Sequence, residues 1–283
     1  MGIKAELFRL TEGIAGRLNL PPISQVYLPE PNTGADRNTE FGVIELADGS
    51  AGLYYAWMGA AQRHMQARYP VAGLTGRDPL DIACCFLSDD QAECSLGLAA
   101  INAISQCVMR RADYVPPSAP DSIGALVLDA DDHLGMVGYF PPLVERLGRR
   151  GIRMTVIEKK THLGQDDAGL RLTQDPRELR HCNKILTTAT VMLNDTVDEI
   201  LACSADAELV VMLGPSAGFF PDPLFAHGVT ALGGSEILDA GLAIERLRGN
   251  QGLDDAARKY LIRADGYPGL GRLLQQGDWS GGG

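Results

Sequence analysis

Residues 135–142 read Gly135-Met-Val-Gly-Tyr-Phe-Pro-Pro142, an apolar run that ends in a Pro-rich elbow. Three more runs of this kind follow along the chain: Lys184-Ile-Leu-Thr-Thr-Ala-Thr190, Val210-Val-Met-Leu-Gly-Pro-Ser216 and Val229-Thr-Ala-Leu-Gly-Gly-Ser235. Apolar runs that alternate with helical stretches are typical of a parallel sheet, and such sheets bind ligands outside the carboxyl ends of their strands. The elbows therefore mark where a functional site is expected.

The second half of the chain, residues 121–283, is predicted to be a Rossmann-like α/β domain with a doubly wound parallel sheet. Expected strands cover 135–140, 153–158, 184–189, 208–213 and 229–233, and they alternate with helices near 142–150, 174–181, 196–203, 221–227 and 236–248. Thr196-Val-Asp-Glu199 has the spacing of a capping box, which predicts a helix that begins there.

The first half, residues 1–115, is predicted to be a smaller α+β domain. Ile3, Leu7, Leu10 and Ile14 have helical spacing, and Asp48-Gly49 favours a tight hairpin turn between 41–46 and 52–57. Residues 21–40 are expected to form a loop, and two helices are expected near 79–87 and 92–110. The linker Pro116-Pro-Ser-Ala-Pro120 separates the two halves, since prolines exclude regular structure.

The composition of the chain limits the kinds of binding partner that are expected. The chain has 283 residues and a net charge of −11, so nonspecific binding to nucleic acid or an anionic membrane is disfavoured. No apolar stretch is long enough for a bilayer, and the N-terminus lacks the pattern of a signal peptide, so a cytoplasmic location is expected. The six cysteines form no CxxC pair and the five histidines no HxH or HExxH motif. A metal site would therefore combine ligands from distant segments.

Two motifs of the commonest users of this architecture are absent. The chain has no GxGxxG and no GxxxxGK[ST], which disfavours a standard dinucleotide site and a P-loop. Gly214-Pro-Ser-Ala-Gly218 fits the letters of GxSxG, but the loop Phe219-Phe-Pro-Asp-Pro223 follows it in place of the helix of a nucleophile elbow, which disfavours a serine hydrolase. Pro142 suits the first position of a helix but removes an amide that could hold a phosphate.

Polar residues at the elbows carry the remaining functional signal, each beside a purely structural interpretation. Glu158 closes its strand about 20 residues past Gly138, where an acid can reach a ribose, or simply face solvent. Thr188 and Asn194 belong to a cluster of hydroxyls and amides that could hold a polar ligand or cap the backbone. Asn102 interrupts an apolar helix and needs a partner if it is buried.

In order along the chain, four segments resemble a family known as the putative heavy-metal chelation proteins. They are Ser95-Leu-Gly-Leu-Ala-Ala-Ile-Asn-Ala103, Gly135 to Pro142, Thr187-Thr-Ala-Thr-Val-Met-Leu-Asn-Asp-Thr196 and Val211-Met-Leu-Gly-Pro-Ser216 with Gly234-Ser235. The resemblance implies an N-terminal domain like the enolase N-terminal unit, joined to a Rossmann-like domain, with a site in the cleft between them. It also implies handling of a metal, a divalent transition metal as cofactor, or a metal chelate.

By position, the resemblance brings Asn102 to the cleft from the N-terminal domain. The facing wall would consist of Gly138, Tyr139, Glu158, Thr188, Asn194, Gly214, Pro215 and Ser216. This chain has Ala189 where the family usually has Gly, which narrows the freedom of that turn. It has Glu93-Cys94 where a basic residue is usual, which argues against an anionic ligand and favours a cation, with Cys94 as a soft donor.

The leading hypothesis is therefore a cytoplasmic two-domain protein that binds a metal ion or a small metal chelate in an interdomain cleft. Whether it also catalyses a reaction is left open, with Glu158 as the acid/base candidate. One alternative is a Rossmann-like enzyme with a nucleotide or an S-adenosylmethionine-type cofactor. A second is a noncatalytic interaction protein, a homodimer through the N-terminal hairpin.

Overall fold

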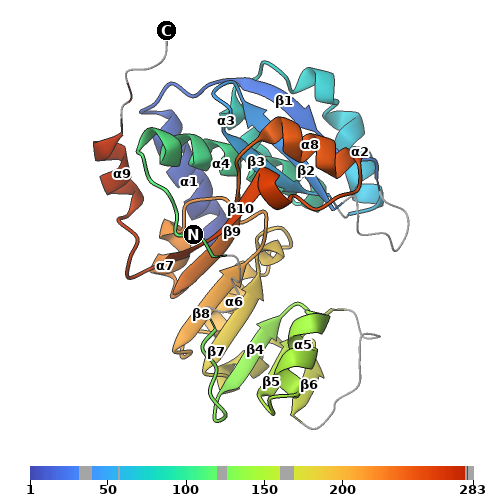
Figure 1. The fold of residues 1–283 in the computed structure, drawn as a ribbon, viewed down its shortest axis with the longest axis vertical. Coiled ribbons are helices and arrows are strands. Elements are labelled where there is room, and N and C mark those ends of the chain that lie inside the picture. Colours follow the sequence, from blue (N-terminus) through green and yellow to red (C-terminus); the bar gives the residue numbers. More distant parts are fainter. Residues whose placement is uncertain (32–39, 57, 120–125, 160–168, 278, 280–283) are drawn as a thin grey trace.

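The computed structural model describes residues 1–31, 40–56, 58–119, 126–159, 169–277 and 279 of the chain (Figure 1). These residues form a sheet of seven strands and a second sheet of three. The fold is thus mixed α/β, as the sequence predicts.

The seven-stranded sheet has the strand order β10-β9-β8-β7-β4-β5-β6. Its strands are β4 (His133–Val137), β5 (Arg153–Ile157), β6 (Leu170–Thr173), β7 (Lys184–Thr188), β8 (Leu209–Leu213), β9 (Ala231–Ile237) and β10 (Ala257–Arg263). All neighbours are parallel except β10, which runs antiparallel to β9. The parallel strands have the Rossmann order. The order in which strands are added to the sheet reverses between the neighbouring strands β4 and β7, and ligands commonly bind at such a reversal.

Helices cover both faces of this sheet because successive strand residues point to opposite sides. On one face, Leu134 and Met136 of β4 belong to a cluster with Leu143 and Leu147 of α5 (Pro141–Gly148). On the other face lie the short helices η4 (Pro176–His181), η5 (Ala189–Met192), α6 (Val197–Cys203) and α7 (Asp222–Ala226).

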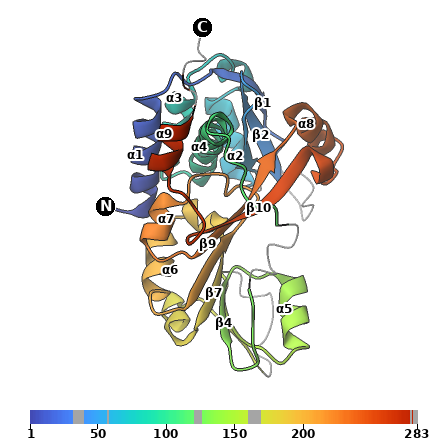
Figure 2. The ribbon, with the colours of Figure 1, turned by 60° about the vertical axis from the view of Figure 1, so that its left-hand side comes forward.

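The three-stranded sheet is antiparallel and consists of β1 (Ile23–Tyr27), β2 (Phe41–Leu46) and β3 (Ala51–Tyr55). One face packs on α4 (Gln91–Arg111), and the other on α8 (Ala240–Arg248), where Val43 and Leu53 cluster with Ala243 and Ile244 (Figure 2). Around α4 lie α1 (Ile3–Ala15), α2 (Ala60–Arg68), α3 (Pro79–Ala83), η2 (Cys84–Leu87) and the late helix α9 (Leu270–Gln276). The main core therefore includes residues from both sides of the Pro-rich linker; the domain boundary at residues 115–121 stays a prediction.

Helix α4 is the central element of the N-terminal half. By length and composition it could cross a membrane, yet 100% of its most apolar window is buried inside the protein. Two glycines let its surroundings approach closely: a Cβ at Gly52 would lie 2.1 Å from the Ala99 carbonyl oxygen, and one at Gly97 would lie 2.0 Å from the Phe86 nitrogen. The apolar length of α4 is therefore that of a core helix.

Several elements differ from the sequence prediction. Residues 21–40 were expected to be a loop, yet Ile23–Tyr27 form β1, and a register shift beside Ile23 breaks the alternation that marks a strand. Strands β6 and β10 and helices α2 and α9 were not predicted, and 174–181 forms a 3₁₀ helix rather than an α-helix. The hairpin at Asp48-Gly49 is confirmed, with Gly49 at a φ of +84°.

Candidate functional site

Four of the predicted site residues meet where the strand order reverses. Gly138 follows β4 with a φ of +91°, and a Cβ there would lie 3.3 Å from Cγ2 of Thr188 at the end of β7. The amide of Tyr139 donates to Oε2 of Glu158 at 3.1 Å, and the Glu158 amide donates to the Thr173 carbonyl at 3.0 Å. The structure thus places Gly138, Tyr139, Glu158 and Thr188 together at the carboxyl edge.

This arrangement differs from a phosphate site. Helix α5 begins with Pro141 and Pro142, which have no N–H groups, so its first turn offers fewer donors to an anion. The amide of the glycine turn already donates to a carboxylate, Glu158, whose charge would repel a phosphate. The absence of GxGxxG in the sequence and this local chemistry agree in disfavouring a bound dinucleotide.

Asn102 joins α4 to the β8 elbow, but within a closed contact. Its Nδ2 donates to the carbonyl oxygens of Ser216 at 2.7 Å and Leu53 at 3.3 Å, which also fixes the orientation of the amide. The side chain is 2% exposed, and its Oδ1 has no hydrogen-bond partner among the described residues. The cavity beside it measures about 20 Å³, room for a single water molecule.

The β8 elbow itself is tightly packed on one side and open on the other. A Cβ at position 214 would lie 2.7 Å from the Cβ of Ala189. Glycine at position 214 therefore leaves room for the alanine side chain at position 189. Ser216 is 3% exposed, and its described contact is through its backbone. Pro215 between them is exposed and faces the open side.

Asn194 lies in a loop that is tied to α1 rather than to the strand-order reversal. The Thr196 hydroxyl donates to Asn194 Oδ1 at 2.6 Å, so it does not cap α6 as the capping-box spacing suggested. Lys4 bridges to Asp195 at 2.6 Å in the same loop. The helix begins where the sequence predicts, but the described hydrogen bond of the Asn194 side chain stays within its own loop.

The Glu93-Cys94 pair has a structural role. Glu93 is nearly buried, and its carboxylate accepts from Arg68 at 2.6 Å and from the Ser88 hydroxyl at 3.0 Å, so its charge is compensated. Burial raises the pKa of the Cys94 thiol to about 11, and its Sγ donates to the Phe86 carbonyl at 3.3 Å. Glu93 therefore gives no reason to exclude an anionic ligand from the cleft.

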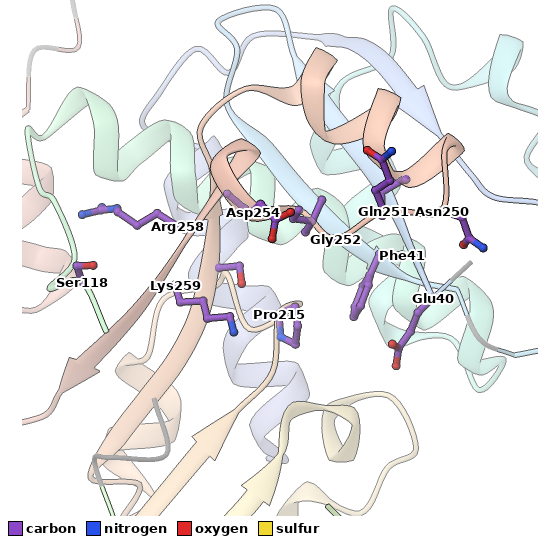
Figure 3. A pocket seen from close by; sticks show the side chains of 14 residues that line it. Glu40, Phe41, Ser118, Pro215, Asn250, Gln251, Gly252, Asp254, Arg258 and Lys259 are labelled. Atoms are coloured by element: carbon purple, nitrogen blue, oxygen red, sulfur yellow. The ribbon is translucent and has the colours of Figure 1, made fainter. Parts of the chain in front are cut away.

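An open cleft of about 700 Å³ lies beside the closed contact, and the two share Pro215 and Ser235 (Figure 3). Its walls come from the start of β2, the linker at Ser118, the β8 elbow at Pro215, the β9–β10 ladder, and the end of α8 with the loop after it. The lining residues are Glu40, Phe41, Ser118, Pro215, Ser235, Leu247, Asn250, Gln251, Gly252, Leu253, Asp254, Ala257, Arg258 and Lys259. Of these residues, only Pro215 is a predicted site residue. Ser235 belongs to the segments that resemble the family and Ser118 to the Pro-rich linker, whereas the lining residues of β10 and of the loop after α8 stand in no motif.

Charges in this cleft are unevenly paired. Arg258 is held by Glu236, and Asp254 pairs with Arg246 at 3.4 Å. Lys259 stands directly opposite Ser235 in the ladder, is exposed, and has no ion-pair partner within the described part of the chain. An ammonium without an ion pair in the described structure, with Ser235 opposite Lys259 in the ladder, suits a carboxylate or another oxyanion; Glu40 adds one carboxylate to the same lining.

The side chains that could bind a metal do not form a cluster in the part of the chain that the structure describes. Among the described residues, no group of three or more His, Cys, Asp or Glu side chains could hold an ion. Soft metals prefer thiolate and imidazole ligands, whereas the carboxyl edge and the cleft present hydroxyls, carboxylates and amines. His162, Asp166 and Asp167 lie outside the described residues.

The chain shows similarity to several proteins. The family model DUF364, described as putative heavy-metal chelation, matches residues 121–264. The uncharacterized protein MJ0500 of Methanocaldococcus jannaschii is 28% identical over 184 residues, which cover 63% of this chain and 69% of that protein. A crystal structure of a DUF364 protein of unknown function from Pyrococcus horikoshii has a TM-score of 0.66 at 21% identity, covering 93% of this chain and 100% of the other. A DUF364 protein of unknown function from Desulfitobacterium hafniense has a TM-score of 0.66 at 20% identity, covering 91% and 98%.

Proposed function

The chain belongs to the DUF364 family, and from this premise we propose that it binds a small anionic organic molecule of the kind that carries a metal as a chelate. The observation that supports this best is the cleft of about 700 Å³ at the β8 elbow, with the unpaired ammonium of Lys259 in its wall. That volume is within the range of small-molecule sites.

A bare heavy-metal ion fits the described residues poorly, because they offer no cluster of soft donors. A chelate brings its own ligand atoms, and what it needs from the protein is hydrogen bonds and charge. Within the cleft lining, Lys259 offers charge, Ser118 and Ser235 offer hydroxyls, and the ring of Phe41 offers an apolar surface. The metal of the family description is therefore assigned to the ligand rather than to a resident site.

The residues at the strand-order reversal would extend this site along the carboxyl edge. Thr188 pairs with Leu213, two residues before Pro215, so Thr188, Gly138 and Glu158 continue the row that begins at the cleft. If a reaction occurs on the ligand, Glu158 is the carboxylate placed to exchange a proton. A cytoplasmic location and a homodimer through the hairpin belong to the same set of proposals.

The test begins with native mass spectrometry of the purified protein, to identify any small molecule that it retains. Calorimetric titrations with citrate, with nickel ions and with the nickel–citrate complex then follow. We expect the two citrate-containing ligands to bind and nickel alone to bind no more tightly than to a denatured control. Lys259→Gln should weaken binding about tenfold, the size of one charge-assisted hydrogen bond.

Arg263→Gln is the matched control, because Arg263 is exposed on the same strand and outside the cleft lining. Tighter binding of nickel ions than of the chelate would contradict the proposal, as would equal effects of the two substitutions.

A further inference from the structure

The opposite, amino-terminal edge of the large sheet carries a groove that the proposed function does not use. It measures about 830 Å³ and lies at the lower end of the molecule in Figure 1, where β4, β5 and β6 begin. The side chains that line it and can carry charge are His133, Arg153, Arg171, Glu178 and His181. The groove is distant in the fold from the cleft, which lies past the carboxyl ends of the strands.

Cations predominate in this groove although the whole chain has a net charge of −11. Glu178 is already bound by Arg171, whose Nη2 donates to Oε1 at 2.8 Å. Arg153 is exposed and has no ion-pair partner in the part of the chain that the structure describes. One guanidinium is therefore uncompensated, and a second has N–H donors left after its bond to Glu178.

His133 is fixed at the floor of the groove. Its Nδ1 lies 2.8 Å from the His181 carbonyl oxygen, which can only accept, so Nδ1 carries the proton in the neutral ring. Its Nε2 then accepts from the hydroxyl of Thr155, a side chain 2% exposed, at 2.8 Å. The ring has one orientation and one tautomer, set by two hydrogen bonds.

The pKa of the His133 ring depends on its burial and on the charges around it. Burial lowers its pKa, and the nearby positive charge of Arg153 lowers it further, while the bond to the His181 carbonyl opposes both. The other ionisable groups around the ring are Glu178 and His181 of η4, Cys182 just after it, and Arg171 of β6; Asp132, next to His133 in the chain, is paired with Lys184 of β7. The dominant charge that acts on the ring is thus the guanidinium of Arg153.

We propose that this groove is a second ligand site, one that binds a phosphate group between the guanidiniums of Arg153 and Arg171. A planar guanidinium matches the oxygens of a phosphate through two parallel hydrogen bonds. The bound anion offsets the charge of Arg153, so the protonation of His133 becomes easier when the site is filled. Anion binding and proton binding at His133 are therefore coupled.

The experiment follows the ring signals of His133 by NMR through a pH titration, in chloride and in inorganic phosphate at equal ionic strength. His133→Gln assigns the signals. We expect phosphate to raise the pKa of His133, and glycerol 3-phosphate to do the same if the site accepts a phosphate monoester rather than the free ion alone. Calorimetry should show phosphate affinity about tenfold lower in Arg153→Gln.

Arg149→Gln is the matched control, since Arg149 is an exposed arginine beyond the groove that pairs with Glu145. Arg171→Gln, which frees Glu178, should also weaken phosphate binding. A His133 pKa that is the same in phosphate and chloride would overturn the proposal, and so would equal losses of affinity in Arg149→Gln and Arg153→Gln. The cleft titrations with citrate are independent of both outcomes.

Discussion

The closed contact around Asn102 and the open cleft beside it share Pro215 and Ser235, yet they differ in almost every physical respect. The first holds about 20 Å³ and is lined mostly by buried residues, while the second holds about 700 Å³ and is lined mostly by exposed and half-buried residues. Most residues that the sequence marked near this elbow belong to the closed contact. A motif can therefore mark the edge of an open cleft while its own side chains hold the surrounding structure together.

The largest effect is expected from filling the closed contact. Gly52→Ala would drive a Cβ against the Ala99 carbonyl and the Asn102 side chain, at 2.1 and 2.8 Å, and both belong to the packed α4 helix. We expect a loss of about 3 kcal/mol in the free energy of unfolding, measured by urea denaturation. Gly13→Ala on α1 is the control, since nothing lies within 4 Å of its Cβ position and a helix interior favours Ala. Similar stabilities for the two variants would show that the contact is looser than described.

Removing the amide at the same contact should have a smaller effect. Asn102→Ala strips the Ser216 and Leu53 carbonyls of their donor, and we expect it to lower the free energy of unfolding by about 2 kcal/mol. Asn19→Ala, at an exposed position, is the control and should stay within about 0.5 kcal/mol of the parent. If Asn102 were primarily a ligand contact, its replacement would instead leave stability unchanged and weaken citrate binding.

A substitution in the cleft should instead weaken ligand binding and leave the free energy of unfolding nearly unchanged. Lys259→Gln removes an exposed charge without an ion pair in the described structure, so the free energy of unfolding should change by less than about 0.5 kcal/mol. Citrate affinity should nevertheless fall about tenfold. Thermal melts with and without citrate separate the two effects, and a Lys259 variant that loses stability without citrate would remove the distinction between the two regions.

The smallest effect concerns pH and the far edge of the sheet. The pKa of His133 is lowered in the folded protein, so below its ordinary value of about 6.5 the unfolded chain binds more protons than the folded one. Stability should therefore fall as the pH drops from about 6.5 toward the folded-state pKa, and His133→Gln should reduce that slope. Melting temperatures between pH 7.5 and 5 measure it. His64→Gln is the control, and an equal change of slope in that variant would contradict the assignment to His133.

The sequence predicts well those strands whose residues form a short apolar run with a clear end. β4, β7 and β8 carry short apolar runs that end in Gly, Thr or Pro elbows, and the apolar run of β5 ends at Glu158, so the positions of these strands could be read directly. β1 could not, because its register shift breaks the alternation. β10 could not, because it is an edge strand whose sequence Ala-Arg-Lys-Tyr-Leu-Ile-Arg mixes charges with apolar residues.

The candidate site divides in the same way. Gly138 and Thr188 could be predicted as neighbours, since the carboxyl ends of parallel strands meet at one edge. The bond from Tyr139 to Glu158 agrees with the spacing of an acid after the second strand. The ion pair between Arg68 and Glu93 could not be predicted from the sequence, because the two residues are 25 positions apart and on different helices.

The sequence by itself determined the parallel sheet and the edge at which its polar elbows gather, because periodicity, glycine and proline act over a few residues. Only the tertiary structure decided which elbow residues are enclosed and which face open space. Helix α8 crosses from the second half to cover the sheet of the first, and the loop after it, with β10, forms a wall of the cleft. Burial and the pairing of charges depend on such long-range packing, and no short stretch of sequence contains both partners.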